Sequence, residues 1–155
     1  MMRVLFVCLG NICRSPMAEA VMRMKVAKAG LSDKISVDSA GTGDWHIGDP
    51  PHRGTQKRLT ASGISFDQIK ARQLKPIDFE KFDRIIAMDQ QNEQDLLKMA
   101  GARYKEKISR FMALLHDRPQ ADVPDPYYTG NFDEVYDLID RGTEQLLEQI
   151  SAGEH

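Results

Sequence analysis

Short apolar runs alternate with longer segments of helical spacing along this chain of 155 residues, and this alternation constrains the fold most strongly. Four segments are typical of buried strands: residues 4–7, 35–37, 84–88 and part of 108–115. Four others have helical spacing: residues 15–29, 52–62, 90–99 and 132–150. Pro16 and Glu19 mark the start of the first helix. Strands that alternate with helices form crossover units, so we expect a single α/β domain over residues 1–155. It should contain a four-stranded parallel sheet with helices on both faces.

Two long polar segments, residues 38–51 and 116–131, are rich in turn-forming residues and are expected to be loops. In a parallel sheet the ligand site lies at the carboxyl ends of the strands. Residues 8–15, residues 39–48 and Asp89 all follow predicted strands, so we expect the functional site at this edge.

Composition and charge argue against several partners and cofactors. A net charge of −2 disfavours nucleic acid as the main partner, because nucleic-acid-binding proteins usually carry a basic surface. The first apolar run is too short for a signal peptide or a membrane span, so we expect a cytoplasmic protein with no membrane partner. No Cys/His cluster has metal-ligand spacing, and we expect neither a metal nor another cofactor. We expect a monomer or a weak dimer.

The segment CLGNICRS, residues 8–15, joins the first expected strand to the first expected helix. A loop of this length at a helix N-terminus points several backbone N–H groups inward and adds the positive end of the helix dipole. Such an arrangement binds a tetrahedral oxyanion. Gly10 lets the backbone turn without a side-chain clash, and Asn11 tolerates left-handed backbone angles. Arg14 carries a planar, permanently charged fork that can hold two phosphate oxygens.

Cys8 stands where the first strand ends, aimed at the centre of this phosphate-binding loop. The N–H groups that bind phosphate also stabilise a thiolate, so we expect Cys8 to be ionised at neutral pH and to attack phosphorus without a separate base. Ser15 is placed to donate a hydrogen bond to the sulfur when Cys8 becomes the leaving group. The alternative is a plain strand–helix connection with a buried cysteine, since Cys followed six residues later by Arg is a weak motif outside its context.

Several blocks of the chain resemble the low-molecular-weight protein-tyrosine phosphatases, in that family's order and over nearly the whole length. They are residues 7–16 (VCLGNICRSP), 38–42 (DSAGT), 71–73 (ARQ), 87–89 (AMD) and 125–128 (DPYY). The first and last blocks are the specific ones. The resemblance implies metal-independent hydrolysis of phosphotyrosine in protein substrates, and of small aryl phosphates, through a cysteinyl-phosphate intermediate.

The resemblance also implies a role for each site residue. Cys8 attacks, Arg14 and the loop amides stabilise the phosphoryl group, and Asp125 protonates the departing phenolate before acting as base toward water. A phenolate is a poor leaving group at neutral pH, so a general acid is needed. Pro126 is expected to hold Asp125 in an extended loop, although an Asp-Pro pair alone is more often just a turn. The remaining loop residues are Leu9, Gly10, Asn11, Ile12, Cys13 and Ser15.

Aromatic side chains are expected around the entrance. Trp45, Tyr127 and Tyr128 would form walls on which a phenyl ring can stack, with ordinary packing as the alternative. Ser39 is expected to hydrogen-bond Asn11 and hold the phosphate-binding loop in its strained shape, unless it is a plain strand-end serine.

The sequence leaves the roles of Asp89, Arg72 and Cys13 open. Asp89 either supports the site or caps a helix, and the case for Arg72 is weaker still. Cys13 is expected to form a reversible disulfide with Cys8 on oxidation and so protect the nucleophile from over-oxidation. The alternative for Cys13 is a small apolar filler under the loop.

Three other functions stay open. An arsenate reductase shares this fold and loop but needs further cysteines downstream, and none follows Cys13. A protein-arginine phosphatase of the same family tends to carry Thr where this chain has Ile12, and the pair Tyr127 and Tyr128 fits an aromatic substrate better. A non-catalytic phosphotyrosine-binding module would have no use for a cysteine under the phosphate or for an acid such as Asp125.

Overall fold

A computed structural model of the chain describes residues 1–118 and 121–153. Two residues of the predicted loop 116–131 and the last two of the predicted domain lie outside the described residues. Four parallel strands form one sheet in the order β2-β1-β3-β4. They are β1 (Met2–Cys8), β2 (Ile35–Gly41), β3 (Arg84–Ala87) and β4 (Ile108–Arg110). The predicted α/β class and its four-stranded parallel sheet are therefore confirmed.

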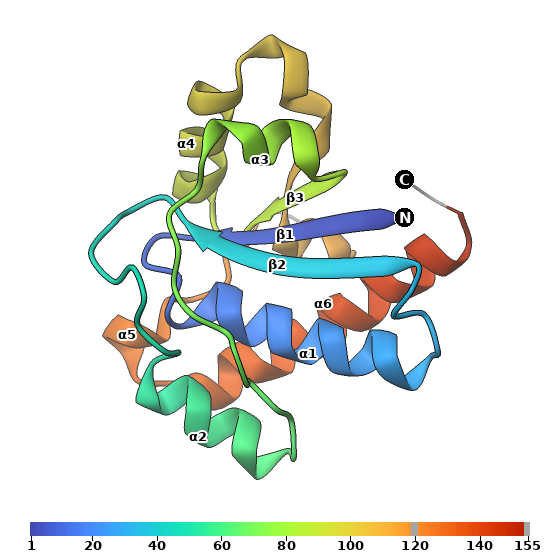
Figure 1. Cartoon of the computed structure of the whole chain (residues 1–155). Helices are drawn as coiled ribbons and strands as arrows, with labels where there is room; N and C mark the ends of the chain where they lie inside the picture. Colours follow the sequence, from blue (N-terminus) through green and yellow to red (C-terminus); the bar gives the residue numbers. More distant parts are fainter. Residues whose placement is uncertain (119–120, 154–155) are drawn as a thin grey trace.

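Helices cover both faces of the sheet, as predicted (Figure 1). One face carries α1 (Arg14–Lys28), α2 (Arg53–Ala61) and α6 (Phe132–Ser151). The other face carries α3 (Pro76–Lys81) and α4 (Gln90–Ala100). The shorter helical segments are η1 (Ala102–Lys107), η2 (Phe111–Leu114) and α5 (Pro126–Thr129).

The central strand β1 explains why the core has two halves. Its residues Val4, Leu5, Phe6 and Val7 are fully buried. Val4 and Phe6 pack into the cluster formed with α1 and α6, whereas Leu5 and Val7 pack against α3 and α4. An apolar run without alternation is typical of a strand that is covered on both faces, and this is what β1 is.

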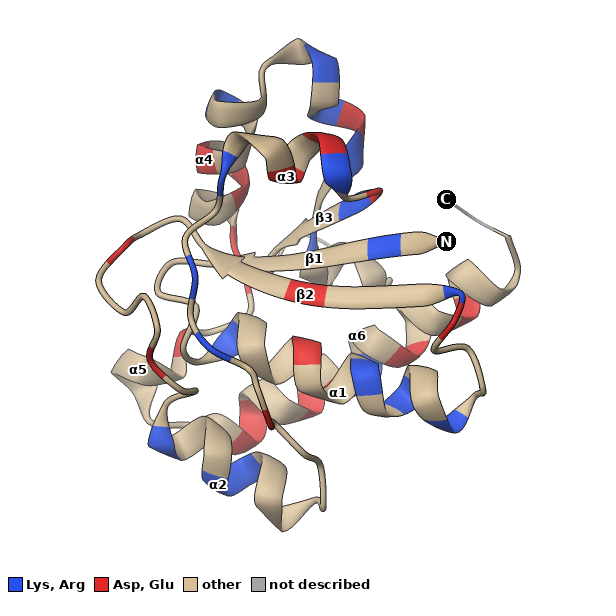
Figure 2. Cartoon of the chain, in the orientation of Figure 1, with Lys and Arg blue, Asp and Glu red and all other residues tan. Residues whose placement is uncertain are grey.

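Charged residues of opposite sign face each other between helices, with acidic residues prominent on α6 and basic residues on α1 and α2 (Figure 2). Lys25 of α1 lies 2.9 Å from Asp140 and 3.2 Å from Glu144 of α6, and Arg58 of α2 lies 2.9 Å from Asp133. The acidic partners are exposed although Lys25 and Arg58 are largely covered, and ion pairs at a protein surface contribute only about 0–1 kcal/mol each. No helix in the described part of the chain has the length and apolar character to cross a membrane.

One predicted boundary was wrong. The predicted loop 38–51 begins too early, because β2 continues to Gly41. Asp38 and Ser39 are polar but lie inside the strand, where distant side chains satisfy them. The segment 108–115 contains the fourth strand, as predicted: β4 occupies Ile108–Arg110, and η2 follows it.

Two short helices, α3 and α5, were not predicted. In α3 the Asp78 carboxylate accepts a hydrogen bond from the Lys75 N–H, and Pro76 occupies the first helical turn. In α5, Asp125 is the N-cap and Pro126 follows it, so the segment after Asp125 is helical rather than extended. Asp125 itself has extended backbone angles, with φ −87° and ψ 107°.

Candidate active site

A pocket of about 220 Å³ opens where β1 ends, at the edge of the sheet where the sequence predicted the site. The phosphate loop (residues 8–15), the segment after β2 and the start of α5 surround it. Its lining residues are Cys8, Leu9, Gly10, Ile12, Cys13, Arg14, Trp45, His46, Asp125, Tyr127 and Tyr128. Of these described residues, His46 was not predicted. The predicted residues Asn11, Ser15 and Ser39 do not line the pocket but support the loop from behind.

The phosphate loop is held in a tight conformation by close contacts. Asn11 has a φ of 57°, in the left-handed region that Asn tolerates better than most residues. A Cβ atom at Gly41, where β2 ends, would lie 2.8 Å from the backbone oxygen of Leu9. A Cβ atom at Gly10 would lie 3.2 Å from His46 Cδ2. A side chain at Gly41 would collide with the backbone of the loop, so β2 and the loop approach this closely only with glycine there, whereas a side chain at Gly10 would crowd the His46 ring.

Cys8 lies at the base of the pocket and is only 2% exposed. Its Sγ is 2.9 Å from Ser15 Oγ, and the Asn11 backbone N–H donates to Sγ at 3.3 Å. Two groups that can donate hydrogen bonds therefore converge on the sulfur from within the loop.

Arg14 is buried, and its guanidinium is anchored along one edge. Nη1 donates to Asp89 Oδ2 at 2.7 Å and to the Val123 carbonyl at 3.0 Å, while Nη2 lies 3.5 Å from Asp125 Oδ2. Burial lowers the pKa of Arg14, but the charges of Cys8, Asp89 and Asp125 and the Asp89 hydrogen bond raise it further, so its pKa lies above its usual value. Asp89 also caps α4 by accepting from the Asn92 N–H at 2.7 Å, so both interpretations of Asp89 apply.

Asp125 lies over the guanidinium at the mouth of the pocket. Its Oδ1 accepts from the Tyr127 N–H at 3.1 Å and its Oδ2 faces Arg14. The rings of Tyr127 and Tyr128 meet edge to face with centroids 5.3 Å apart. Trp45, Tyr127 and Tyr128 line the pocket and are 68%, 56% and 78% exposed, so these three rings border its opening.

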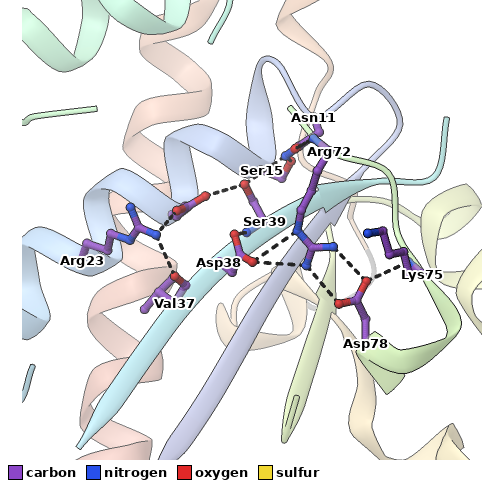
Figure 3. Close-up of polar contacts among 10 residues, drawn as sticks. Asn11, Ser15, Arg23, Val37, Asp38, Ser39, Arg72, Lys75 and Asp78 are labelled. Atoms are coloured by element: carbon purple, nitrogen blue, oxygen red, sulfur yellow. Dashed lines mark hydrogen bonds and ion pairs between the residues drawn. The ribbon is translucent and has the colours of Figure 1, made fainter. Parts of the chain in front are cut away.

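Behind the loop, side chains from α1, β2 and the segment before α3 meet around Asn11 (Figure 3). Asn11 Nδ2 donates to Ser15 Oγ at 2.8 Å and to Ser39 Oγ at 3.0 Å, and the Arg72 backbone N–H donates to Asn11 Oδ1 at 2.9 Å. Ser39 Oγ in turn donates to Glu19 Oε1 at 2.6 Å. Asn11 is therefore fixed from three parts of the chain.

The structure shows the contacts of Arg72, whose role the sequence did not define. Its guanidinium makes a two-pronged contact with Asp78, at 3.0 and 3.1 Å, and lies 3.2 Å from Asp38 (Figure 3). The side chain thereby ties α3 to β2. Because this fixes the backbone of Arg72, it also fixes the N–H that reaches Asn11.

Two buried titratable groups have raised pKa values: Cys13 within the phosphate loop and Glu19 behind it. Burial, helped by the negative charges of Cys8 and Asp125, raises the pKa of Cys13 to about 12, so Cys13 is a protonated thiol at neutral pH. Burial also raises the pKa of Glu19 to about 7, against the effect of the Ser39 hydrogen bond and Arg23. Cys8 and Cys13 are both free in the structure.

Glu19 was interpreted only as a residue of the helix start. In the structure it lies well inside α1, on the face that packs against β2, and it is 3% exposed. The available signal was its spacing: Glu19 follows Ser15 by four residues, which places both side chains on the same face of a helix.

Within residues 1–118 and 121–153, no three His, Cys, Asp or Glu side chains are grouped so that they could hold a metal ion.

Fold and pocket together define a class of protein: an α/β domain whose phosphate loop encloses a cysteine at the carboxyl end of the first strand. Residues 3–154 match the model of the family described as low molecular weight phosphotyrosine protein phosphatase. The chain belongs to this family.

Individual members of the family match this chain over nearly its whole length. The low molecular weight protein-tyrosine-phosphatase YfkJ of Bacillus subtilis is 58% identical over 150 residues, which are 97% of this chain and 96% of YfkJ. The crystal structure of YfkJ matches with a TM-score of 0.96 at 56% identity, covering 100% of this chain and 98% of that chain.

Two further solved structures belong to proteins that are named for different activities. A protein tyrosine phosphatase from Entamoeba histolytica, with Hepes in its active site, has a TM-score of 0.92 at 38% identity and covers 99% of both chains. DARP, a Drosophila arginine phosphatase, has a TM-score of 0.86 at 33% identity and covers 96% of this chain and 98% of that chain.

Proposed function

We propose that this chain is a protein-tyrosine phosphatase that hydrolyses phosphotyrosine in proteins, and small aryl phosphates, through a cysteinyl-phosphate intermediate. The observation that carries the proposal is that Cys8, Arg14 and Asp125 line one pocket, with the sulfur at its base and the carboxylate at its mouth. A nucleophile, an electrostatic stabiliser and an acid therefore surround the same small volume.

In the first step, the phosphate occupies the phosphate loop and Cys8 Sγ attacks phosphorus. The bond between phosphorus and the phenolic oxygen breaks as the sulfur–phosphorus bond forms. Arg14 and the loop N–H groups stabilise the negative charge on the transferring oxygens. Asp125 donates its proton to the departing phenolate oxygen, which leaves as a neutral phenol.

In the second step, Asp125 has become a carboxylate and takes a proton from the water that attacks phosphorus. The sulfur–phosphorus bond breaks and inorganic phosphate forms. The electron pair returns to Cys8, and the Ser15 hydroxyl at 2.9 Å can donate a hydrogen bond to the leaving sulfur.

The exposed rings at the mouth support an aromatic substrate. A phenyl ring that enters between Trp45 and the tyrosines would stack or meet them edge to face, which contributes about 0.5–1.5 kcal/mol per aromatic pair. Arginine phosphatase activity is the second candidate, because DARP shares the fold. An apolar Ile12 in the pocket lining favours the aryl substrate. The cytoplasmic location, the lack of nucleic-acid and membrane partners, and the monomeric or weakly dimeric state stay predictions from the sequence.

The test is turnover of phosphotyrosyl, phosphoseryl and phosphoarginyl peptides by the wild-type chain and by Cys8→Ser. We expect hydrolysis of the phosphotyrosyl peptide by the wild type and none by Cys8→Ser. A preference for the phosphoarginyl peptide would replace the proposed substrate. Persistent turnover by Cys8→Ser would remove the proposed nucleophile.

We also propose that Cys13 protects Cys8 during oxidation. Peroxide converts the Cys8 thiolate to a sulfenic acid; the Cys13 thiol then displaces water and a disulfide forms, which a thiol reductant reverses. After peroxide and then thiol, the wild type should recover more activity than Cys13→Ala, with untreated samples of each as controls. Equal recovery would leave Cys13 as a buried filler.

A further inference from the structure

An unbroken line of hydrogen bonds runs from the sulfur of Cys8 to a carboxylate inside α1. From Sγ it passes to Ser15 Oγ at 2.9 Å, to Asn11 Nδ2 at 2.8 Å, to Ser39 Oγ at 3.0 Å, and to Glu19 Oε1 at 2.6 Å. None of these side chains is more than 3% exposed. The line is therefore shielded from solvent along its length, and each member depends on its neighbours for a partner.

The direction of these bonds follows from one backbone group. The Arg72 N–H can only donate, so the Asn11 atom that faces it at 2.9 Å must be the oxygen. Asn11 Nδ2 then faces both serines and donates to each of them. Each serine oxygen already accepts from Asn11, so its own proton is free to point away: from Ser39 toward Glu19, and from Ser15 toward Cys8.

Glu19, at the far end of the line, holds the Ser39 hydroxyl in this direction. A carboxylate oxygen only accepts, so it holds the Ser39 proton on its own side and leaves the Ser39 lone pairs for Asn11. A hydroxyl that donates to an ionised group is also a stronger acceptor, because hydrogen bonds in a chain polarise one another. Without that acceptor, the buried Ser39 proton would have to find another partner, and its lone pairs would turn away from Asn11.

Burying this carboxyl group opposes its ionisation. Burial raises the pKa of Glu19 to about 7, and the nearby negative charge of Asp38 adds to this. The Ser39 hydrogen bond, Arg23 and Arg72 act in the opposite direction. Arg23 is 47% exposed, so its ion pair with Glu19 can be removed without opening the core.

We propose that Glu19 is a positioning residue for the phosphatase reaction: it fixes the Ser39 hydroxyl so that Ser39 accepts from Asn11, and this second anchor of Asn11, beside the Arg72 N–H, keeps the Ser15 hydroxyl directed at the Cys8 sulfur. This inference rests on the proposed role of Cys8 as nucleophile. The Ser15 hydrogen bond matters most when the thiolate is expelled from phosphorus, so Glu19 acts mainly on hydrolysis of the cysteinyl phosphate.

Three variants separate the hydrogen-bond acceptor from the charge. Glu19→Leu removes the acceptor and keeps similar volume, whereas Glu19→Gln keeps an oxygen for Ser39 without the charge. Arg23→Met is the matched control, because it removes the exposed ion pair and leaves the line of hydrogen bonds intact. Each would be measured by steady-state kinetics with an aryl phosphate, by the pre-steady-state burst of phenol, and by the rate of Cys8 alkylation against pH.

For Glu19→Leu we expect kcat to fall about tenfold, as for the loss of one charge-assisted hydrogen bond, and KM to change less than about twofold. The burst rate should fall less than kcat, and alkylation near neutral pH should slow. Glu19→Gln should recover most of kcat, and Arg23→Met should resemble the wild type. Wild-type kcat and alkylation in Glu19→Leu, or an equal loss in Arg23→Met, would overturn the proposal.

If Glu19→Leu does not fold, Ser39→Ala cuts the same line with a smaller change of volume. Its kcat should fall by a similar factor with a smaller fall in the burst rate, whereas wild-type kcat in Ser39→Ala would contradict a line that connects Glu19 to Cys8. Loss of turnover in Cys8→Ser together with wild-type behaviour of all Glu19 and Ser39 variants would reject this inference alone. Turnover by Cys8→Ser would instead reject the proposed function.

Discussion

The base and the rim of the pocket are held in different ways. At the base, Cys8 and Arg14 are almost completely buried, and their partners come from α1, from the segment after β3 and from the segment before α5. At the rim, Trp45, Tyr127 and Tyr128 stand more than half exposed. A base residue therefore cannot move without disturbing several elements, whereas a rim residue can. The difference suggests that the base performs the reaction and the rim selects the substrate.

The largest expected effect is at the base. In Arg14→Lys, a point charge replaces a planar group that is fixed by Asp89 and the Val123 carbonyl, so kcat should fall on the order of 10³-fold. Steady-state kinetics with an aryl phosphate would measure this. Arg53→Lys, at an exposed arginine, is the control. If Arg14→Lys lost as little activity as Arg53→Lys, the two-pronged contact with phosphate would be disproved.

Asp125 is an exception to the division between base and rim, because it lies at the rim and yet is proposed to take part in the reaction. In Asp125→Asn, kcat should fall roughly 10²-fold for phosphotyrosine, because no acid protonates the phenolate, and much less for activated aryl phosphates. A series of aryl phosphates with different leaving groups would measure the trend. A uniform loss across that series would show that Asp125 is not the acid.

The pH dependence of stability tests how strongly the support behind the base of the pocket is shielded from water. The folded-state pKa of Glu19, about 7, lies above its ordinary value of 4.5, so the folded chain binds this proton more tightly and the free energy of unfolding falls as pH rises through that range. The shift corresponds to roughly 3 kcal/mol, and Glu19→Gln should remove it. Urea unfolding at pH 4.5, 6 and 8 would measure the difference from the wild type.

An exposed carboxyl provides the control for that measurement. Glu80→Gln, at a solvent-exposed position of α3, should follow the wild-type pH dependence. If Glu19→Gln also followed the wild type, the Glu19 carboxyl would not be desolvated in the folded protein.

The smallest expected effect is at the rim. In Trp45→Ala, KM for a phosphotyrosyl peptide should rise about threefold to tenfold with kcat almost unchanged, since a stacking surface is lost but no reacting group moves. Ile47→Ala is a suitable control, because Ile47 is exposed and close in sequence but does not line the pocket. A large fall in kcat for Trp45→Ala would contradict the interpretation that the rim only selects the substrate.

Local sequence signals predicted the base of the site better than its support. The phosphate loop could be predicted because an apolar strand, a Gly-Asn turn and a Ser-Pro helix start occur in immediate succession. The end of β2 could not be predicted, since Asp38 and Ser39 have the polarity of a loop. Their partners Arg72 and Glu19 are 34 and 20 residues away, so only folding reveals how they are satisfied.

The helix α5 and His46 were missed for other reasons. The helix α5 has only four residues, which is too short for any periodic pattern, although Asp125 and Pro126 carry ordinary helix-start signals. His46 lies in an irregular segment, and nothing in the local pattern relates it to Gly10, over which it lies. Residues whose role depends on a contact between distant segments are therefore the ones that sequence patterns miss.

The anchoring of Arg14 has a consequence for the thermodynamics of ligand capture. A free arginine side chain carries about 2 kcal/mol of rotamer entropy, which binding an anion would normally remove. Here Asp89 and the Val123 carbonyl have already immobilised the guanidinium before any anion arrives. Association should therefore lack that entropic penalty, and a calorimetric titration with an unreactive oxyanion such as sulfate should show a less unfavourable entropy in the wild type than in Asp89→Ala.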